Sequence, residues 1–145
     1  MIFIVLAQML GPGLSQSATS KVVGSWKVEI AFQNGESRSF QFEALESGKG
    51  SFLLLDPRLK AWGPARPSEA KWTQGEGDSV MFSGRVEFPL GNVGRDPGTL
   101  VLHGKFGSDS TIIGEAKFFR GDEDPTDPKA TAAKSGTFKA TRLTG

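Results

Sequence analysis

Few residues of this chain have the types and spacing that catalysis requires. His103 is the single histidine among 145 residues, and cysteine is absent. A metal site needs further histidine or cysteine ligands, and an activated nucleophile needs a base beside it. His103 also falls on the outward parity of its expected strand, with Val101 and Lys105. We therefore predict that His103 is not catalytic and that the protein is not an enzyme.

The densest acidic segment is residues 122–127, with the sequence Asp-Glu-Asp-Pro-Thr-Asp. Calcium takes oxygen ligands of this kind, but an EF-hand loop has glycine at its sixth position and glutamate at its twelfth. Asp127 and Ala133 occupy those positions here. We interpret the segment as a solvated loop stiffened by Pro125 and Pro128. We predict no metal and no cofactor.

Single carboxylates are expected on the outward faces of the strands, where basic residues of neighbouring strands would pair with them. A general acid–base site would need a second carboxylate in a buried environment, and the pattern predicts none. The outward carboxylates are Glu29, Glu43, Glu87 and Glu115, and their expected partners are Lys27, Arg38, Arg85 and Lys117.

The elements that position these residues are β-strands. Apolar and polar residues alternate along most of the chain, between turns rich in Gly, Asn, Asp and Pro, which is typical of strands with one buried face. Asn34-Gly35 predicts a type I′ hairpin, and long loops are expected over residues 56–67 and 89–98. The expected strands are 24–32, 36–43, 51–55, 70–74, 79–88, 99–106, 111–120 and 136–142. This order predicts an all-β protein, an antiparallel up-and-down β-barrel of about eight strands.

Two motifs resemble the lipocalin and calycin group of barrels. Gly24-Ser25-Trp26 opens the first strand, and Arg142 lies in the last. The resemblance implies that Arg142 packs across the Trp26 ring at a closed end of the barrel, where an arginine over an aromatic face is stabilising. A second lipocalin motif, an acidic residue and an arginine near a middle hairpin, is not found. The chain is therefore expected to be a lipocalin-like barrel.

Aromatic residues and glycines share the expected inward faces. Glycines at such positions either permit sharp curvature or leave volume for a ligand, and curvature is the preferred interpretation. A tryptophan in the loop 56–67 would act either as a lid over an apolar cavity or as a cap on the core. The candidate ligand-binding residues are Phe40, Phe42, Trp62, Trp72, Phe82, Gly84, Phe88, Gly104, Phe106 and Gly114.

Two functional hypotheses follow. In the first, the barrel binds an apolar or amphipathic small molecule in its interior. In the second, it is a structural or protein-interaction module with a filled core, whose interface is the strand 51–55, apolar on both faces. The cavity distinguishes the two. A net charge of +1, from 17 basic and 16 acidic residues, argues against a nucleic-acid partner. The oligomeric state and the identity of any ligand are not predicted.

The N-terminal sequence predicts export. Residues 1–10 are an apolar run, followed by Gly11-Pro12-Gly13 and by small residues. The run is too short to span a bilayer and resembles a secretory signal peptide, although no Lys or Arg precedes it. We expect a signal peptide at residues 1–18 and a single barrel domain at residues 19–145. The mature protein would be periplasmic or secreted, with no stable membrane anchor.

Overall fold

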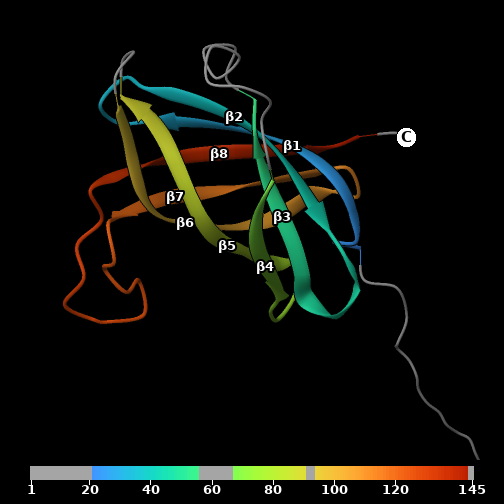
Figure 1. Cartoon of the computed structure of the whole chain (residues 1–145). Coiled ribbons are helices and arrows are strands. Elements are labelled where there is room, and N and C mark those ends of the chain that lie inside the picture. The colour runs from blue at the N-terminus through green and yellow to red at the C-terminus, as the bar shows by residue number, and fades with distance from the viewer. Residues whose placement is uncertain (1–20, 56–66, 91–93, 144–145) are drawn as a thin grey trace, which may run out of the picture.

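A computed structural model describes residues 21–55, 67–90 and 94–143. Within these ranges the chain forms eight β-strands, coloured from blue to red along the chain in Figure 1. They are β1 (Gly24–Phe32), β2 (Ser37–Ala44), β3 (Lys49–Leu54), β4 (Ser68–Gln74), β5 (Ser79–Leu90), β6 (Gly94–Ser108), β7 (Thr111–Arg120) and β8 (Lys134–Arg142). One 3-10 turn, η3 (Glu46–Gly48), joins β2 to β3. No helix in these ranges is long and apolar enough to cross a membrane.

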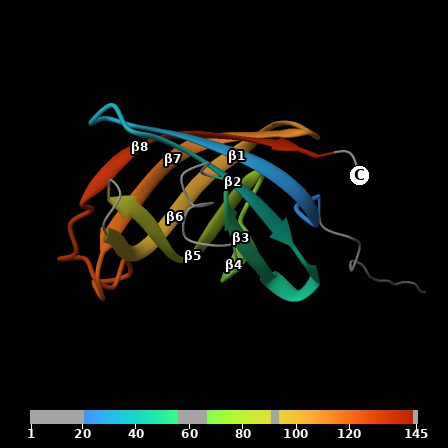
Figure 2. The same ribbon diagram turned by 45° about the horizontal axis from the view of Figure 1, so that its top comes forward.

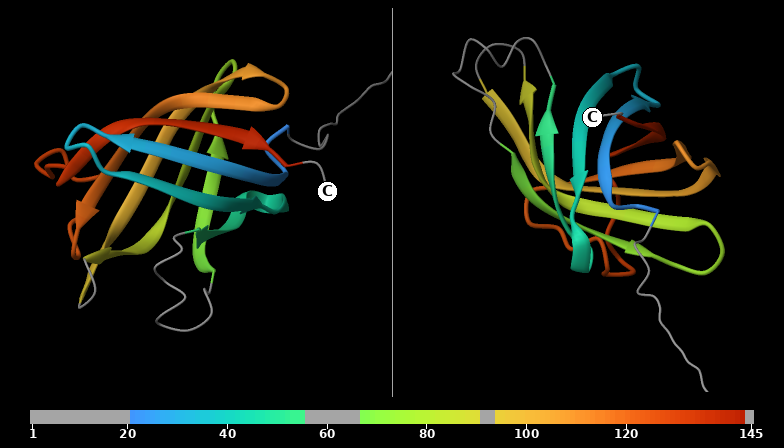
Figure 3. Two further views of the ribbon diagram at one scale, coloured as in Figure 1. Left: turned by 90° about the horizontal axis from the view of Figure 1, so that it is seen from above. Right: turned by 90° about the vertical axis from the view of Figure 1, so that its right-hand side faces the viewer.

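The eight strands close into an antiparallel up-and-down barrel, which confirms the predicted fold class. Each strand pairs with the next along the chain, and β8 returns to pair with β1. Figure 2 shows the red β8 beside the blue β1, and the two views of Figure 3 show the curved wall from two further sides. Closure pairs both outermost strands of the sheet and so protects its edges.

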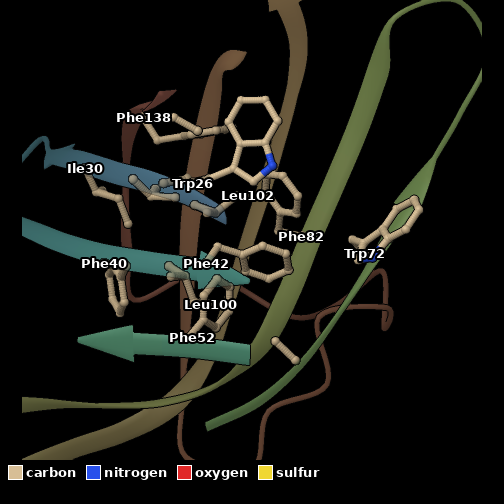
Figure 4. Close-up of a cluster of buried hydrophobic side chains, with 14 of the residues drawn as sticks. Trp26, Ile30, Phe40, Phe42, Phe52, Trp72, Phe82, Leu100, Leu102 and Phe138 are labelled. Atoms are coloured by element: carbon tan, nitrogen blue, oxygen red, sulfur yellow. The ribbon is translucent and has the colours of Figure 1, made fainter. Parts of the chain in front are cut away.

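The alternation predicted from the sequence sets which side chains face inward. From Trp26 to Phe32, every second residue of β1 is buried, and β2 likewise buries Phe40, Phe42 and Ala44. In β3 both Phe52 and Leu54 contact the core, while Leu55 is exposed. The buried residues form one continuous hydrophobic cluster, part of which is drawn in Figure 4.

The first hairpin differs from the predicted type I′ turn. Gly35 has a φ of +92°, but Asn34 does not have a positive φ. The Gly35 amide donates to the Phe32 carbonyl, and the Phe32 amide donates to the Glu36 carbonyl. These bonds define a three-residue loop in which only the glycine adopts the left-handed conformation. Glu36 follows this loop, and one of its carboxylate oxygens lies 3.0 Å from a terminal nitrogen of Arg38.

The expected loop over residues 89–98 was wrong. β5 continues to Leu90 and β6 begins at Gly94, so that Pro89 lies opposite Arg95. Proline lacks an amide donor, but the Pro97 carbonyl still accepts a hydrogen bond from the Gly121 amide, at 2.8 Å. Pro89 and Pro97 therefore occupy positions of the β5–β6 pairing at which the lack of a backbone amide donor is tolerated. The hairpin is longer than predicted, and this extension places Asp96 inside the barrel end.

Candidate functional site

Five charged residues gather at the end of the barrel where β2 and β8 begin. Residues directly opposite in an antiparallel pair point to the same face. Arg38 lies opposite buried Ile30, Asp96 opposite buried Phe88, and Lys134 opposite buried Phe118. All three therefore point inward. With Glu36, just before β2, and Arg120, the last residue of β7, they form what we call the charged end: Glu36, Arg38, Asp96, Arg120 and Lys134.

Lys134 is the centre of the charged end. Its side chain is 8% exposed, and its ammonium lies 2.8 Å from a carboxylate oxygen of Glu36 and 3.9 Å from one of Asp96. Three phenylalanine rings surround the same ammonium: the ring centroids of Phe32, Phe88 and Phe118 are 5.9, 5.4 and 5.8 Å away. Aromatic faces attract a cation at these distances. The carboxylates and the aromatic rings thus compensate for the hydration that the buried ammonium has lost.

Asp96 and Arg120 form a complete bidentate pair. Arg120 donates from Nε to one carboxylate oxygen at 2.8 Å and from a terminal nitrogen to the other at 3.0 Å. The Asp96 side chain is 4% exposed, whereas that of Arg120 is 57% exposed. The hydrogen bond to Asp96, with the charge of the same carboxylate, raises the pKa of Arg120 further above its ordinary value. Both oxygens of the buried carboxylate are satisfied.

Arg38 and Glu36 form an incomplete pair. Arg38 donates from one terminal nitrogen to Glu36 at 3.0 Å and from the other to the Ser37 carbonyl at 3.0 Å. Its side chain is 10% exposed, and its Nε is buried without an acceptor. The guanidinium carbon lies 5.4 Å from the Phe88 ring centroid. A hydrogen bond from Lys134 lowers the pKa of Glu36 most, and a hydrogen bond from Asn34 lowers it further. The positive charges of Lys134 and Arg38 also lower this pKa.

Sequence reasoning missed the charged end. Arg38 was expected on the outer wall as a partner for an outward carboxylate, but its parity matches that of Phe40 and it points inward. The outer pairs also differ from the expected ones. Glu87 lies 3.9 Å from Arg95, and Arg85 lies 3.8 Å from Asp122. The available signal was the period-two count, which places Arg38 with Phe40 once it is continued to the strand end.

The candidate interior residues are packed against one another. Phe40, Phe42, Phe82 and Phe88 are buried, and Phe106 is partly buried against the same core. The ring centroids of Phe42 and Phe82 are 4.3 Å apart, and those of Phe88 and Phe118 are 4.8 Å apart. Figure 4 shows Phe42 beside Phe82. Phe40, Phe42, Phe82 and Phe88 are thus almost fully buried in a packed aromatic interior.

The inward glycines lie close against atoms of neighbouring strands. A Cβ at Gly104 would lie 2.9 Å from the Phe138 ring and closer still to the Ile113 carbonyl, and one at Gly114 would overlap the His103 carbonyl. At Gly84 it would lie 2.8 Å from the Ala70 side chain. These contacts favour the preferred interpretation, curvature, over volume for a ligand. The hollows at these glycines are open and lie on the outer wall, lined at Gly104 and Gly114 by His103, Lys105, Ile113, Glu115 and Thr137.

Two tryptophans are fixed by hydrogen bonds to main-chain carbonyls. Trp26 Nε1 donates to the Val22 carbonyl at 2.8 Å, and Trp72 Nε1 donates to the Leu45 carbonyl at 2.8 Å. Trp72 is buried as predicted, but this bond ties it to the β2–β3 turn. Trp62, the predicted lid or cap, lies outside the described residues. The structure thus assigns Trp26 and Trp72 to the frame of the barrel.

The opposite end of the barrel is closed as the resemblance implied. The Arg142 guanidinium carbon lies 4.3 Å from the Trp26 ring centroid. The same guanidinium donates to the main-chain carbonyls of Val23, at 3.0 Å, and Lys21. Arg142 therefore ties the last strand to the segment that precedes the first. The contact between Arg142 and the Trp26 ring that the resemblance implied is therefore present, whereas membership of the lipocalin family is not shown.

The remaining candidates for chemistry lie apart from the charged end. His103 is exposed on the outer wall. In residues 21–55, 67–90 and 94–143, no three His, Asp or Glu side chains lie close enough to hold a metal ion. In the acidic segment, Asp124 accepts from the amide and hydroxyl of Thr126, at 2.8 and 2.7 Å, and these bonds lower its pKa. The acidic segment is thus organised by local turns.

The fold and the charged end define an eight-stranded antiparallel barrel with an aromatic interior and a cluster of charged side chains at one end. No protein-family model and no curated protein sequence matches the chain. Two solved structures are similar to it in shape. One is "EF1p2_mFAP2b bound to DFHBI", at 17% identity and a TM-score of 0.48, over 86% of this chain and 94% of that one. The other is the redesigned beta barrel b11L5F_LGL, at 13% identity and a TM-score of 0.39, over 86% and 93%.

Proposed function

We propose that this protein is a non-enzymatic barrel that binds a small amphipathic molecule, and that the binding site is its charged end. The observation that supports this is the Nε of Arg38, which is buried without an acceptor next to the aromatic core. A buried donor without a partner costs free energy that a ligand oxygen would recover. Aromatic surface beside a few oriented polar groups is typical of small-molecule sites.

Because the interior is packed, we place the proposed binding site at the end of the barrel and not in its middle. Phe42 packs against Phe82, and Phe88 packs against Phe118, so a ligand deep inside would have to displace several rings. At the charged end, the guanidinium of Arg38 covers Phe88. A ligand there needs only the movement of polar side chains.

A second function, a protein-interaction module with a filled core, is favoured by the same packing. In that hypothesis the charged end is a structural cap and the partner binds the outer wall. Ile113 is 54% exposed there, beside the hollow at Gly104 and Gly114. A contiguous apolar patch would mark such an interface. Of the other exposed large apolar residues described, Met81 lies on β5, and Leu45, Leu55 and Leu143 lie just beyond the ends of β2, β3 and β8.

We also propose that the protein acts outside the cytoplasm, because the apolar run and small residues of segment 1–18 are typical of a signal peptide. N-terminal sequencing of the protein from its own host tests this. A mature chain that begins near Thr19 is expected, and an intact Met1 in a cytoplasmic fraction would contradict the proposal.

Native mass spectrometry tests the binding function. The protein is purified from its own host, and one retained small molecule per chain is expected. Arg38→Met should lose that molecule, whereas Arg85→Met, a change on the outer wall, should keep it. If all three proteins have only the mass of the polypeptide and bind no apolar fluorescent probe, the interaction module is the better hypothesis.

A further inference from the structure

We infer that the polar group of the ligand is a carboxylate, and that it binds the edge of the Arg38 guanidinium formed by Nε and a terminal nitrogen. The inference rests on the proposed binding function and adds the chemical class of the ligand. It follows from a comparison of the two arginines at the charged end, from the balance of charge there and from the apolar surface beside Arg38.

The two arginines differ in how much of this edge is used. Arg120 offers Nε and a terminal nitrogen to the two oxygens of Asp96, which is the fork geometry that suits a planar carboxylate. Arg38 offers Glu36 only a terminal nitrogen. Its Nε is shielded from solvent, so water does not replace the missing acceptor. The unfilled place at Arg38 corresponds to the one that an Asp96 oxygen fills at Arg120.

The balance of charge favours a single negative charge. The charged end has three cations, Arg38, Arg120 and Lys134, and two carboxylates. The two carboxylates are already engaged: Glu36 accepts from Lys134, Arg38 and Asn34, and Asp96 accepts from Arg120. One monoanion would neutralise the remaining positive charge. A dianion such as a phosphate monoester would leave excess negative charge beside nearly buried groups, which is costly.

The surroundings of Arg38 favour an anion with an apolar body. The guanidinium lies over Phe88 at 5.4 Å. Leu54, opposite Phe40 on the neighbouring strand, is only partly buried and packs against the core. A hydrocarbon or aromatic group bonded to the carboxylate would lie on this surface. The carboxylate reaches Nε when the Arg38 side chain turns, since Glu36 and the Ser37 carbonyl hold it by one hydrogen bond each.

Calorimetric titration of the full chain tests the class of ligand. The probes are dodecanoate, its methyl ester and dodecylammonium, each below the concentration at which it forms micelles. We expect dodecanoate to bind, and the ester and the ammonium to bind at least about tenfold more weakly, because each lacks the charge-assisted hydrogen bonds. Arg38→Lys retains the charge but removes the fork, and it should abolish the preference for dodecanoate over the ester.

The matched control is Arg85→Lys, which changes an exposed arginine of the outer wall and should keep the preference. Circular dichroism and the thermal midpoint establish that both variants fold. If the three probes bind equally, the carboxylate inference is wrong and the proposed binding function stands. If no probe binds the wild type, both are wrong. A preference that persists in Arg38→Lys would overturn the assignment to Arg38.

Discussion

The guanidinium of Arg142 lies over the indole ring of Trp26 and joins the last strand of the barrel to the first. The two residues are directly opposite in the β1–β8 pairing, and the guanidinium carbon is 4.3 Å from the ring centroid. Trp26 is buried and donates to the Val22 carbonyl. Arg142 holds the Val23 and Lys21 carbonyls on the other side. One residue pair therefore fixes the barrel seam and the entering chain together.

Loss of this arginine should weaken the barrel. Arg142→Ala is expected to lower the free energy of unfolding by about 1–3 kcal/mol, because it removes the cation–π contact and hydrogen bonds to three main-chain carbonyls. Urea denaturation followed by tryptophan fluorescence measures the change. Thr141→Ala, on the exposed face of the same strand, is the control and should change stability little. An Arg142→Ala protein as stable as the control would contradict the structural role.

A methyl group at Gly104 should also destabilise the barrel. Gly104→Ala brings a Cβ against the Ile113 carbonyl and the Phe138 ring, and overpacking of this kind costs about 1–3 kcal/mol. Gly107→Ala is the matched control, because the nearest atom to a Cβ there is the Thr111 hydroxyl at 3.4 Å. Thermal unfolding of both variants provides the comparison. Equal midpoints would show that the strand accommodates a side chain at Gly104.

Removal of the Lys134 side chain should create a cation site. Lys134→Ala leaves Glu36 and Asp96 without their shared ammonium, and the loss of one partner from a buried ion pair costs about 3 kcal/mol or more. Ethylammonium chloride should then raise the thermal midpoint of the variant more than sodium chloride does, since the cation would occupy the space between the carboxylates and the three rings.

The wild type should show no such difference between the two salts. Lys134→Met provides a second control, because its side chain fills the space without a charge. If ethylammonium stabilises Lys134→Ala and Lys134→Met equally, the effect is not binding in the vacated space.

Stability should fall in acid partly through Glu36. Its pKa is lowered in the folded protein from an ordinary value of 4.5, so the unfolded chain binds a proton more readily. The carboxylate therefore stabilises the fold above pH 4.5, and this contribution is lost as the pH falls through the folded-state pKa. Glu36→Gln should reduce the loss of stability between neutral and acidic pH, measured by urea denaturation at several pH values. Asp124→Asn provides a comparison, since the Asp124 pKa is also lowered but the residue is fully exposed.

The alternation of residue types was sufficient to predict the barrel. β1 and β7 have the predicted bounds, and the inward faces of β1 and β5 are those expected. A period of two is unambiguous where large apolar residues alternate with charged ones, as from Trp26 to Phe32. The closure between β1 and β8 followed from the number of strands and was confirmed by their pairing.

The charged end could not be predicted in the same way. Arg38 was assigned to the outer wall as a partner for an outward carboxylate, and Lys134 precedes the expected strand 136–142. Arg38 and Lys134 are inward by position, and what permits this is the tertiary arrangement of carboxylates and rings around them. Asp96 was hidden further because it lies in the segment 89–98, whose prolines and glycines suggested a loop. The lack of space at Gly104 also depends on how closely the neighbouring strand approaches it, and a single sequence does not specify that distance.

The β1–β8 seam has a consequence for how the chain reaches its folded state. Trp26 and Arg142 are 116 positions apart, yet they are direct neighbours in the ladder. Contacts between segments so distant in sequence slow folding, because the intervening chain must first be ordered. Until β8 docks, β1 and β7 each present a row of unpaired backbone groups to other molecules. During synthesis this interval ends only after β8 has left the ribosome, so a nascent chain that lacks these last residues is the form most exposed to aggregation.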